Sequence, residues 1–390
     1  MSDFDAALAS SRRAFSRFTE RCRSGVTAYR LTPASDESPY ARCFGVFSRH
    51  LTGDLIEPLE QASLARAIRE SARHTRGSGV DARGKGFRQL LAFSLSALAA
   101  LGVLDDDPLE DLITEQISQD VARTLAEYGC LAGRPGSGNQ AMFTAIFLIH
   151  GREHLGIDTA ARIDDWLTLH LRAMNRFGFW GPDSGMTHLQ FQNGYHQYEI
   201  LEYLRAHNPR REESIAAVRS LSDAEGHFAP YPGGGGCYDY DAVFLLTPGG
   251  RVPDVETDRV LSRTAATLLA EQQSDGGFVE SLYVRPRGRM QIKRMAAHVA
   301  SGARNPRLFA ERLRFALTLQ RPKHERIQTH WSVYARRWDE SDLWDSWFRM
   351  ITLARIHAAR DQSSAAGWGF IDYPGIGYHP SVSRGWQIDK

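Results

Sequence analysis

Several segments of the chain are apolar on every side and recur at similar intervals. A helix that is apolar all round must be covered on every side by other elements. The segments begin about 50 residues apart, and the last interval is about twice as long. This period predicts about seven copies of one unit, with an unmarked copy near residue 293. The segments are Cys43–Val46, Phe87–Leu101, Ala141–Ile149, Tyr198–Leu204, Ala242–Leu246 and Met350–Ile356.

Amphipathic segments separate these apolar ones. Leu109, Leu112 and Ile113, for example, start a single stripe at steps of three and four residues. Alternation of amphipathic and fully apolar helices predicts an all-α fold, an α/α toroid of six or seven helical hairpins with long loops over one end. We find no period-2 strand pattern of useful length. We expect one domain over 1–390, with N-terminal hairpins in 1–130, motif-bearing hairpins in 131–360 and a C-terminal tail in 361–390.

Composition excludes several classes of protein. The formal net charge is +1, with 24% charged and 42% hydrophobic residues, which excludes disordered and nucleic-acid-coating chains. No apolar run reaches the ~20 residues that span a bilayer, and the N-terminus lacks the apolar core of a signal peptide. The cysteines show no C-x-x-C spacing. We therefore expect a cytoplasmic protein with a small-molecule partner, and the oligomeric state stays open.

The two kinds of connection differ in length and composition. Links that follow an apolar segment are short, whereas links that precede one are long and rich in glycine, aromatic and charged residues. Long connections are uncommon unless they have a function. We therefore expect the site at the end of the ring where the apolar helices begin. Helix N-termini at that end would favour an anionic group, and the charged loops predict a bowl with many charges.

The run Gln272–Phe278 resembles the Q-x-x-D-G-G-F/W repeat of the terpenoid cyclase and protein prenyltransferase toroid superfamily. Degenerate copies occur at Asp223–Phe228 and Phe177–Gly181. The resemblance implies that each copy ties the end of an outer helix to the loop before the next inner helix.

Further motifs resemble the same superfamily. Gly236–Ala242 is similar both to the G-C-Y-S-F-W run of prenyltransferase β subunits and to the D-x-D-D-T-A-V run of class II cyclases. The second alignment places Asp239 at the proton-donating aspartate. Asn193–His196 resembles G-x-A-H, whose histidine faces a diphosphate, and Asp342–Ser346 resembles D-x-Y-H-T, whose histidine binds zinc.

The chain departs from these motifs at several positions. Gly235 and Asp345 stand where the prenyltransferases have zinc ligands, and Cys237 and Tyr240 replace the flanking aspartates of the cyclase motif. We therefore expect no metal or other cofactor, with Mg²⁺ considered only for a diphosphate substrate.

Asp239 and Asp241 form the first candidate cluster. Two carboxyl groups close together between apolar walls raise one pKa, which makes a general acid. The glycines Gly233–Gly236 favour function because they let the backbone approach a ligand. The same positions also suit an ordinary N-cap at Asp241 and a loop acid at Asp239.

Tyr195, His196 and Glu199 form the second cluster, since His196 and Glu199 are three residues apart and share a helical face. With Asn193 they also resemble the sites of α/α-toroid polysaccharide lyases. A histidine at an inner-helix start equally suits a hydrogen-bonded core position.

Basic and aromatic segments provide further candidates. Basic residues near 290 suit a phosphate or carboxylate, aromatic rings suit a cation or a sugar face, and both kinds also suit solvated loops. The candidate binding residues are Asn193, Glu199, Trp180, Tyr238, Arg285, Arg287, Arg289, Lys293, Trp331, Tyr334, Asp342 and Asp345.

The leading functional hypothesis is a terpenoid-cyclase-like enzyme, an isomerase or lyase. It would carry out acid-initiated cyclisation or isomerisation of an isoprenoid, with or without a diphosphate. Asp239 would donate the proton, Asp241 would tune it and His196 would act as base. The alternative is a saccharide lyase or hydrolase in which Tyr195 and His196 are base and acid and Asn193 holds a uronate. A third hypothesis is a toroid that binds a ligand without chemistry.

Overall fold

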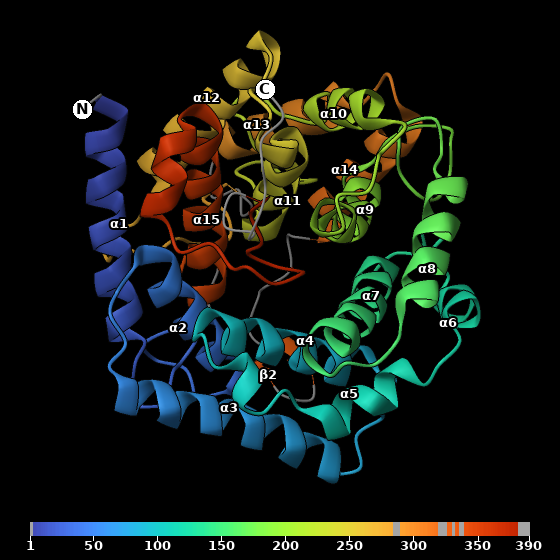
Figure 1. Ribbon diagram of the computed structural model, residues 1–390. Coiled ribbons are helices and arrows are strands. Elements are labelled where there is room, and N and C mark those ends of the chain that lie inside the picture. Colours follow the sequence, from blue (N-terminus) through green and yellow to red (C-terminus); the bar gives the residue numbers. More distant parts are fainter. Residues whose placement is uncertain (1–2, 284–288, 319–325, 330–331, 335–338, 381–390) are drawn as a thin grey trace.

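The computed structural model describes residues 3–283, 289–318, 326–329, 332–334 and 339–380, and it shows the expected α/α toroid (Figure 1). Within these residues, six helices form a closed inner ring in which each packs against the next and α15 packs against both α11 and α2. The inner helices are α2 (Pro39–Thr52), α4 (Lys85–Ala100), α7 (Ser137–His154), α9 (His188–Tyr203), α11 (Gly236–Leu246) and α15 (Leu343–Arg360).

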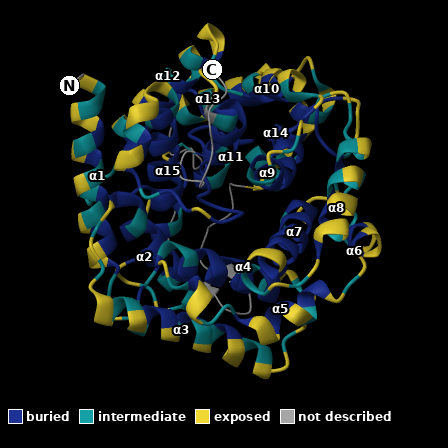
Figure 2. Cartoon of the chain, viewed as in Figure 1, coloured by how far each residue is buried: buried dark blue, intermediate teal, exposed yellow. Residues whose placement is uncertain are grey.

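An outer layer of amphipathic helices covers this ring (Figure 2). The apolar stripes face inward and the charged sides face solvent. The outer helices are α1 (Asp3–Arg21), α3 (Pro58–Gly77), α5 (Glu110–Ile117), α6 (Val121–Tyr128), α8 (Ala160–Ala173), α10 (Arg211–Arg219) and α12 (Val255–Glu271). Single turns of 3₁₀ helix occur at Leu104–Asp106 and Pro248–Gly250, and a longer one at Gln362–Gly367.

The prediction of a seventh repeat near residue 293 is wrong. The segment near residue 293 forms α13 (Arg289–Ser301), which pairs with α14 (Pro306–Thr318) outside the inner ring. Because α15 already packs directly against α11, no place remains for another inner helix between them. The double interval before α15 is therefore an insertion, and the structure selects six hairpins from the six or seven expected.

A short antiparallel hairpin, β1 (Arg326–Thr329) and β2 (Ser332–Tyr334), also lies in this insertion and contacts α4. It was not expected from the sequence, because strands of three or four residues are too short to show an alternating pattern.

Three loops between outer and inner helices share one turn, about 50 residues apart. The amide of Asn175 donates to the carbonyl of Phe179, that of Asp223 to His227 and that of Gln273 to Gly277. A glycine with positive φ occupies the fourth position of each turn. In the last copy the side-chain amide of Gln272 donates to the backbone carbonyl of Ser11 in α1 at 3.0 Å. This copy thus joins the end of α12 to the neighbouring outer helix α1, and Gln272 also donates to Gly276 O of its own loop at 2.8 Å.

The C-terminal tail closes the end of the ring at which the inner helices finish, and Figure 1 shows it crossing the centre of the ring. The buried Arg355 donates to Tyr378 O at 3.0 Å, and the Tyr373 hydroxyl lies 3.0 Å from His150 Nδ1 of α7. The ring is therefore closed at this end. None of the described helices is both long and apolar enough to cross a membrane.

Inner helices α7 and α9 approach closely where α7 begins. The amide of Gly138 donates to the side chain of Asn193 at 2.7 Å, which caps α7 from the neighbouring helix. A Cβ at position 138 would lie 1.9 Å from Asn193 O, so this contact needs glycine.

We expect Gly138→Ala to lower the free energy of unfolding by about 2 kcal/mol or more, because one of the two helices must move. Urea denaturation measures this change. Gly77→Ala is the matched control, since a Cβ there meets nothing within 4 Å, and it should leave stability unchanged or slightly raised. Equal effects of the two substitutions would contradict the close approach.

Candidate functional site

A cavity of about 140 Å³ lies among the inner helices, and each of the six contributes at least one lining residue. Most of the lining residues lie in the first three turns of the helices, toward the end that the long loops predict, and Glu199 lies further along α9. They are Tyr40, Gln89, Phe93, Asn139, Met142, Gln192, Tyr195, His196, Glu199, Cys237, Asp241, Trp344, Phe348 and Ile376.

Aromatic and aliphatic side chains form half of the described lining, and Ile376 of the C-terminal tail is one of them. No lysine or arginine is among the described residues that line the cavity. The described part of the wall therefore does not show the expected highly charged bowl. Two acids and a histidine provide its ionisable chemistry.

Asp241 is the most unusual of these groups. It is 1% exposed, and within the described structure neither of its carboxyl oxygens has a hydrogen-bond partner. Burial raises the pKa of Asp241 well above its ordinary value, and the charges of Glu199 and Asp239 add to the effect. A buried carboxyl group in this state holds its proton at neutral pH. The cavity wall therefore carries a neutral acid with a proton to give.

Glu199 provides a second buried carboxyl group, two turns along α9 from Gln192. It accepts a hydrogen bond from the Tyr195 hydroxyl through Oε1, and Oε2 has no partner among the described residues. Burial raises the pKa of Glu199 to about 8, although the Tyr195 hydrogen bond and the Arg355 charge oppose this rise. Glu199 is therefore mostly protonated at neutral pH as well.

His196 is a neutral base in this setting. Burial lowers its pKa to about 3, and the charge of Lys85 acts in the same direction. Its Nε2 lies 3.1 Å from the Asn139 amide nitrogen, which makes Nε2 the acceptor. Its Nδ1 lies 3.9 Å from Glu199 Oε2. The expected grouping of Tyr195, His196 and Glu199 is present.

Asp239, the expected proton donor, lies outside the cavity lining. Its carboxylate pairs with Arg349 and lies 3.0 Å from His227 Nδ1, and it accepts from the Phe228 amide at 2.8 Å. Burial alone would raise the pKa of Asp239, but the charges of His227 and Arg349 outweigh burial and lower it. An ionised carboxylate in ion pairs has no proton to donate, so the geometry does not support Asp239 as the proton donor.

Ion pairs also extend from His227 to a second acid. His227 Nε2 lies 3.2 Å from Glu271 Oε1. Burial opposes protonation of His227, but Asp239 and Glu271 raise its pKa to about 10. The imidazolium is thus shared between two carboxylates that enclose it.

The glycine run before α11 fits around these ion pairs rather than around the cavity. A Cβ at Gly234 would lie 2.4 Å from Asp239 Oδ2, and one at Gly236 would lie 2.7 Å from Asp345 Oδ1. Arg349 also donates to Gly233 O at 3.1 Å. The glycines therefore leave room for buried charged side chains. They were expected from the sequence to leave room for a ligand.

Other predicted binding residues have structural contacts away from the cavity. Asn193 caps α7 and the Trp180 indole donates to His170 O at 2.9 Å. Tyr238 packs against Phe191, and Asp342 caps α15 by accepting from the Asp345 amide at 2.8 Å. None of these is among the residues that line the cavity.

The predicted basic patch does not reach the cavity in the described residues. Arg289 and Lys293 are exposed on α13. Arg285, Arg287 and Trp331 lie outside the described residues, as does the side chain of Tyr334 in β2.

Most of the cavity wall was missed by sequence reasoning. Six of the missed residues stand before the apolar segments that marked the inner helices, so only the true start of each helix could have signalled them. Ile376 had no such signal, because only the folded tail brings it there. The missed residues are Tyr40, Gln89, Phe93, Asn139, Met142, Gln192, Cys237, Trp344, Phe348 and Ile376.

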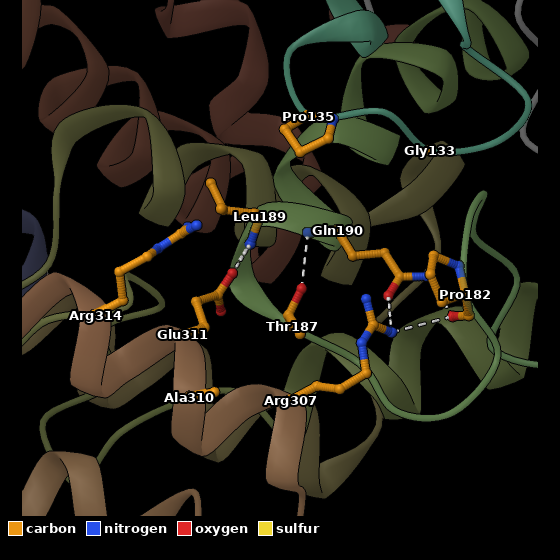
Figure 3. A pocket seen from close by; sticks show the side chains of 10 residues that line it. All are labelled: Gly133, Pro135, Pro182, Thr187, Leu189, Gln190, Arg307, Ala310, Glu311 and Arg314. Carbon is orange, nitrogen blue, oxygen red and sulfur yellow. Dashed lines mark hydrogen bonds between the residues drawn. The ribbon is translucent and has the colours of Figure 1, made fainter.

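A larger groove of about 360 Å³ lies outside the ring, between α14 and the loops before α7 and α9. Figure 3 shows that its polar groups hold α14 in place, since Glu311 accepts from the Leu189 amide and Arg307 lies against Gln190 and Pro182. The smaller central cavity contains the unpaired acid, so it is the candidate site. No group of three or more His, Cys, Asp or Glu in the described residues could hold a metal ion.

Comparison with solved structures shows the same fold. An aspartate-to-asparagine variant of the type II terpene cyclase MstE from Scytonema, bound to its substrate geranylgeranyl dihydroxybenzoate, aligns with 91% of this chain and 97% of its own, at 14% identity and a TM-score of 0.50. An arginine-to-alanine variant with the same substrate aligns with 92% and 99%, at 12% identity and a TM-score of 0.51.

A glycosidase variant in complex with glucose aligns with 92% of this chain and 99% of its own, at 14% identity and a TM-score of 0.48. No family model matches the sequence, and no curated protein is similar to it. The likenesses to the two MstE variants show the α/α toroid.

Asp239 and Asp241 should respond differently to replacement by asparagine. We expect Asp239→Asn to lower the free energy of unfolding by about 3 kcal/mol, because it leaves the buried charges of Arg349 and His227 less compensated. Asp241→Asn should change it by less than about 1 kcal/mol, because it replaces one neutral group by another. Urea denaturation at neutral pH measures both. A larger loss in Asp241→Asn than in Asp239→Asn would show that the two environments are misassigned.

Glu199 should make stability depend on pH. Because its pKa is higher in the folded protein, the unfolded chain releases this proton first, and the free energy of unfolding falls as pH rises from about 4.5 to about 8. Glu199→Gln should make this part of the curve flatter, whereas Glu213→Gln, at an exposed site, should not. Unfolding curves over this pH range are the measurement, and identical slopes in all three proteins would contradict the raised pKa.

Proposed function

We propose that the protein is an enzyme of the terpenoid-cyclase type, which starts cyclisation or isomerisation of an isoprenoid by protonating a carbon–carbon double bond. The observation that carries this proposal is the buried carboxyl group of Asp241, which has no hydrogen-bond partner in the described structure, a raised pKa and aromatic rings around it in the cavity wall. An unsatisfied buried polar group costs stability, and a function explains why this chain has one.

In the proposed first step, the Asp241 carboxyl proton moves to one carbon of the alkene. The π electron pair forms the new C–H bond, which leaves a tertiary carbocation on the substrate and a carboxylate on Asp241. A second double bond of the same chain can then attack the cation and form a C–C bond, which closes a ring. Loss of a proton from a neighbouring carbon ends the reaction with no net change in atoms.

Neighbouring groups support each stage of this reaction. Burial and the negative charge of Asp239 raise the pKa of Asp241, so they keep the acid protonated before substrate arrives. Rings such as Phe93, Trp344 and Phe348 offer π faces to the carbocation. His196 is neutral and accepts the final proton in this proposal.

The size of the cavity limits what enters it. Its volume of about 140 Å³ is below the roughly 300–1,000 Å³ of sites for drug-sized ligands. We therefore propose that one end of the isoprenoid reaches Asp241 while the rest extends toward the starts of the inner helices. The two MstE variants bind geranylgeranyl dihydroxybenzoate, and a substrate of that isoprenoid class is consistent with the aromatic side chains in the wall.

The saccharide hypothesis has less support. A glycoside hydrolase of the common type needs one protonated and one ionised carboxyl group, but the pKa values of Asp241 and Glu199 are both raised. The proposed uronate ligand Asn193 caps α7, and no arginine lines the described cavity.

Asp241→Asn should lower cyclisation or isomerisation at least 100-fold, because the amide has no acidic proton to donate. Wild-type activity should fall as pH rises through the raised pKa of Asp241. Incubation with polyprenyl substrates, with and without a diphosphate, followed by mass spectrometry of hydrocarbon products, measures this.

Asp258→Asn, at the surface of α12, is the control and should keep full activity. Full activity in Asp241→Asn would reject the acid assignment. Formation of an unsaturated uronate from uronate oligosaccharides, without isoprenoid products, would favour the saccharide hypothesis.

A further inference from the structure

The helical hairpin α13–α14 exposes an unusual share of apolar side chains. Of eleven large hydrophobic residues exposed in the described parts of the chain, five lie on these two helices. The exposed fraction reaches 76% for Met290 on α13 and 68% for Leu317 on α14. The hairpin therefore has an apolar surface that the described parts of the protein leave uncovered. The five residues are Met290, Ile292, Phe309, Leu313 and Leu317.

On α14 the exposed apolar residues form one stripe. Phe309, Leu313 and Leu317 are four residues apart, so they lie above one another on one side of the helix. The other side of α14 is held against the ring (Figure 3), where Glu311 accepts from the amides of His188 and Leu189 at the start of α9. These contacts prevent the helix from rotating its apolar stripe inward.

The hairpin is also strongly basic. Residues 289–318 contain seven lysines and arginines and a single acid, which is a net charge of +6. The whole chain carries +1, so the other residues together carry −5. The acid of the hairpin, Glu311, is buried against α9, whereas Arg289, Lys293, Arg304 and Arg314 are exposed. Positive charge and apolar surface therefore occur on the same exposed element.

We propose that the α13–α14 hairpin binds the surface of an anionic lipid membrane and lies in the plane of the interface. Phe309, Leu313 and Leu317 insert between the lipids, and the basic side chains pair with anionic headgroups. Exposed apolar residues flanked by Lys and Arg are the chemistry that such an interface recognises. A second copy of the chain fits less well, because a two-fold contact between hairpins would bring like charges together.

The α13–α14 hairpin lies close to the helix that carries part of the cavity wall. α14 binds the first turn of α9, and the next turn of α9 carries Gln192 and Tyr195 in the cavity wall. Docking through the hairpin therefore brings the membrane to the end of the ring at which the cavity lies. The benefit to the site rests on the proposed function, because an isoprenoid substrate partitions into lipid. The proposal of a membrane-binding surface does not depend on that function.

The test is co-sedimentation of the full-length protein with vesicles, without substrate. We expect binding to an equal mixture of phosphatidylcholine and phosphatidylglycerol, little binding to phosphatidylcholine alone, and weaker binding as salt screens the charges. Phe309→Ser/Leu313→Ser/Leu317→Ser should weaken binding to the mixed vesicles about tenfold or more. Arg289→Gln/Lys293→Gln/Arg304→Gln should do the same. Circular dichroism checks that each variant is folded.

Leu55→Ser/Leu59→Ser is the matched control. These leucines are 77% and 86% exposed, but they lie just before and at the start of α3 and not on the α13–α14 hairpin. It should bind as the wild type does. Absence of binding to mixed vesicles, or equal binding by the triple-serine variant, overturns the proposal. Light scattering that shows a dimer in the wild type, lost in the triple-serine variant without vesicle binding, assigns the surface to a second copy instead.

Failure of this proposal is distinguishable from failure of the proposed function. Vesicle binding is measured with no substrate present, and cyclisation is measured in detergent solution with no vesicles. A protein that converts an isoprenoid but ignores lipid refutes only the membrane surface. A protein that binds lipid but has no activity on isoprenoids refutes only the reaction.

Discussion

The inner helices are apolar on every side, so the fold depends on closing them into a ring in which each is covered by its neighbours. A row of such helices would leave its two end members uncovered, and contact of α15 with both α11 and α2 removes those ends. Outer helices then cover the ring from outside, and the tail covers the end where the inner helices finish. The cavity lies among the six inner helices, toward the end where they begin.

Asp239 and Asp241 are two residues apart, but their surroundings shift their pKa values in opposite directions. Asp239 turns toward Arg349 and His227, which pair with its charge and favour ionisation. Asp241 turns toward the cavity, where burial and the nearby acids favour its neutral form. The cost of burying Asp239 is thus offset by ion pairs, and its charge in turn helps keep Asp241 protonated. This separation of roles supports the proposed acid chemistry.

Sequence reasoning reached the architecture more reliably than it reached the site. Fully apolar segments such as Ala141–Ile149 predicted inner helices correctly, because periodicity is a local property of the chain. The segment near residue 293 was misread, since the interval alone cannot distinguish a ring helix from an insertion of equal length. In the site, Tyr195, His196, Glu199 and Asp241 were expected and do meet in one cavity. Asp239 was assigned from its position in a motif, which says nothing about the direction of its side chain.

The sequence by itself determined the helical hairpins, their period of about 50 residues and the end of the ring that holds the site. It could do so because burial of an apolar helix and the length of a loop are encoded within short stretches of chain. Only the tertiary structure decided the number of hairpins, the ionisation of each acid and the presence of Ile376 in the cavity. Those properties depend on charges and side chains more than 100 residues apart, such as Asp239 and Arg349, which meet only when the ring closes.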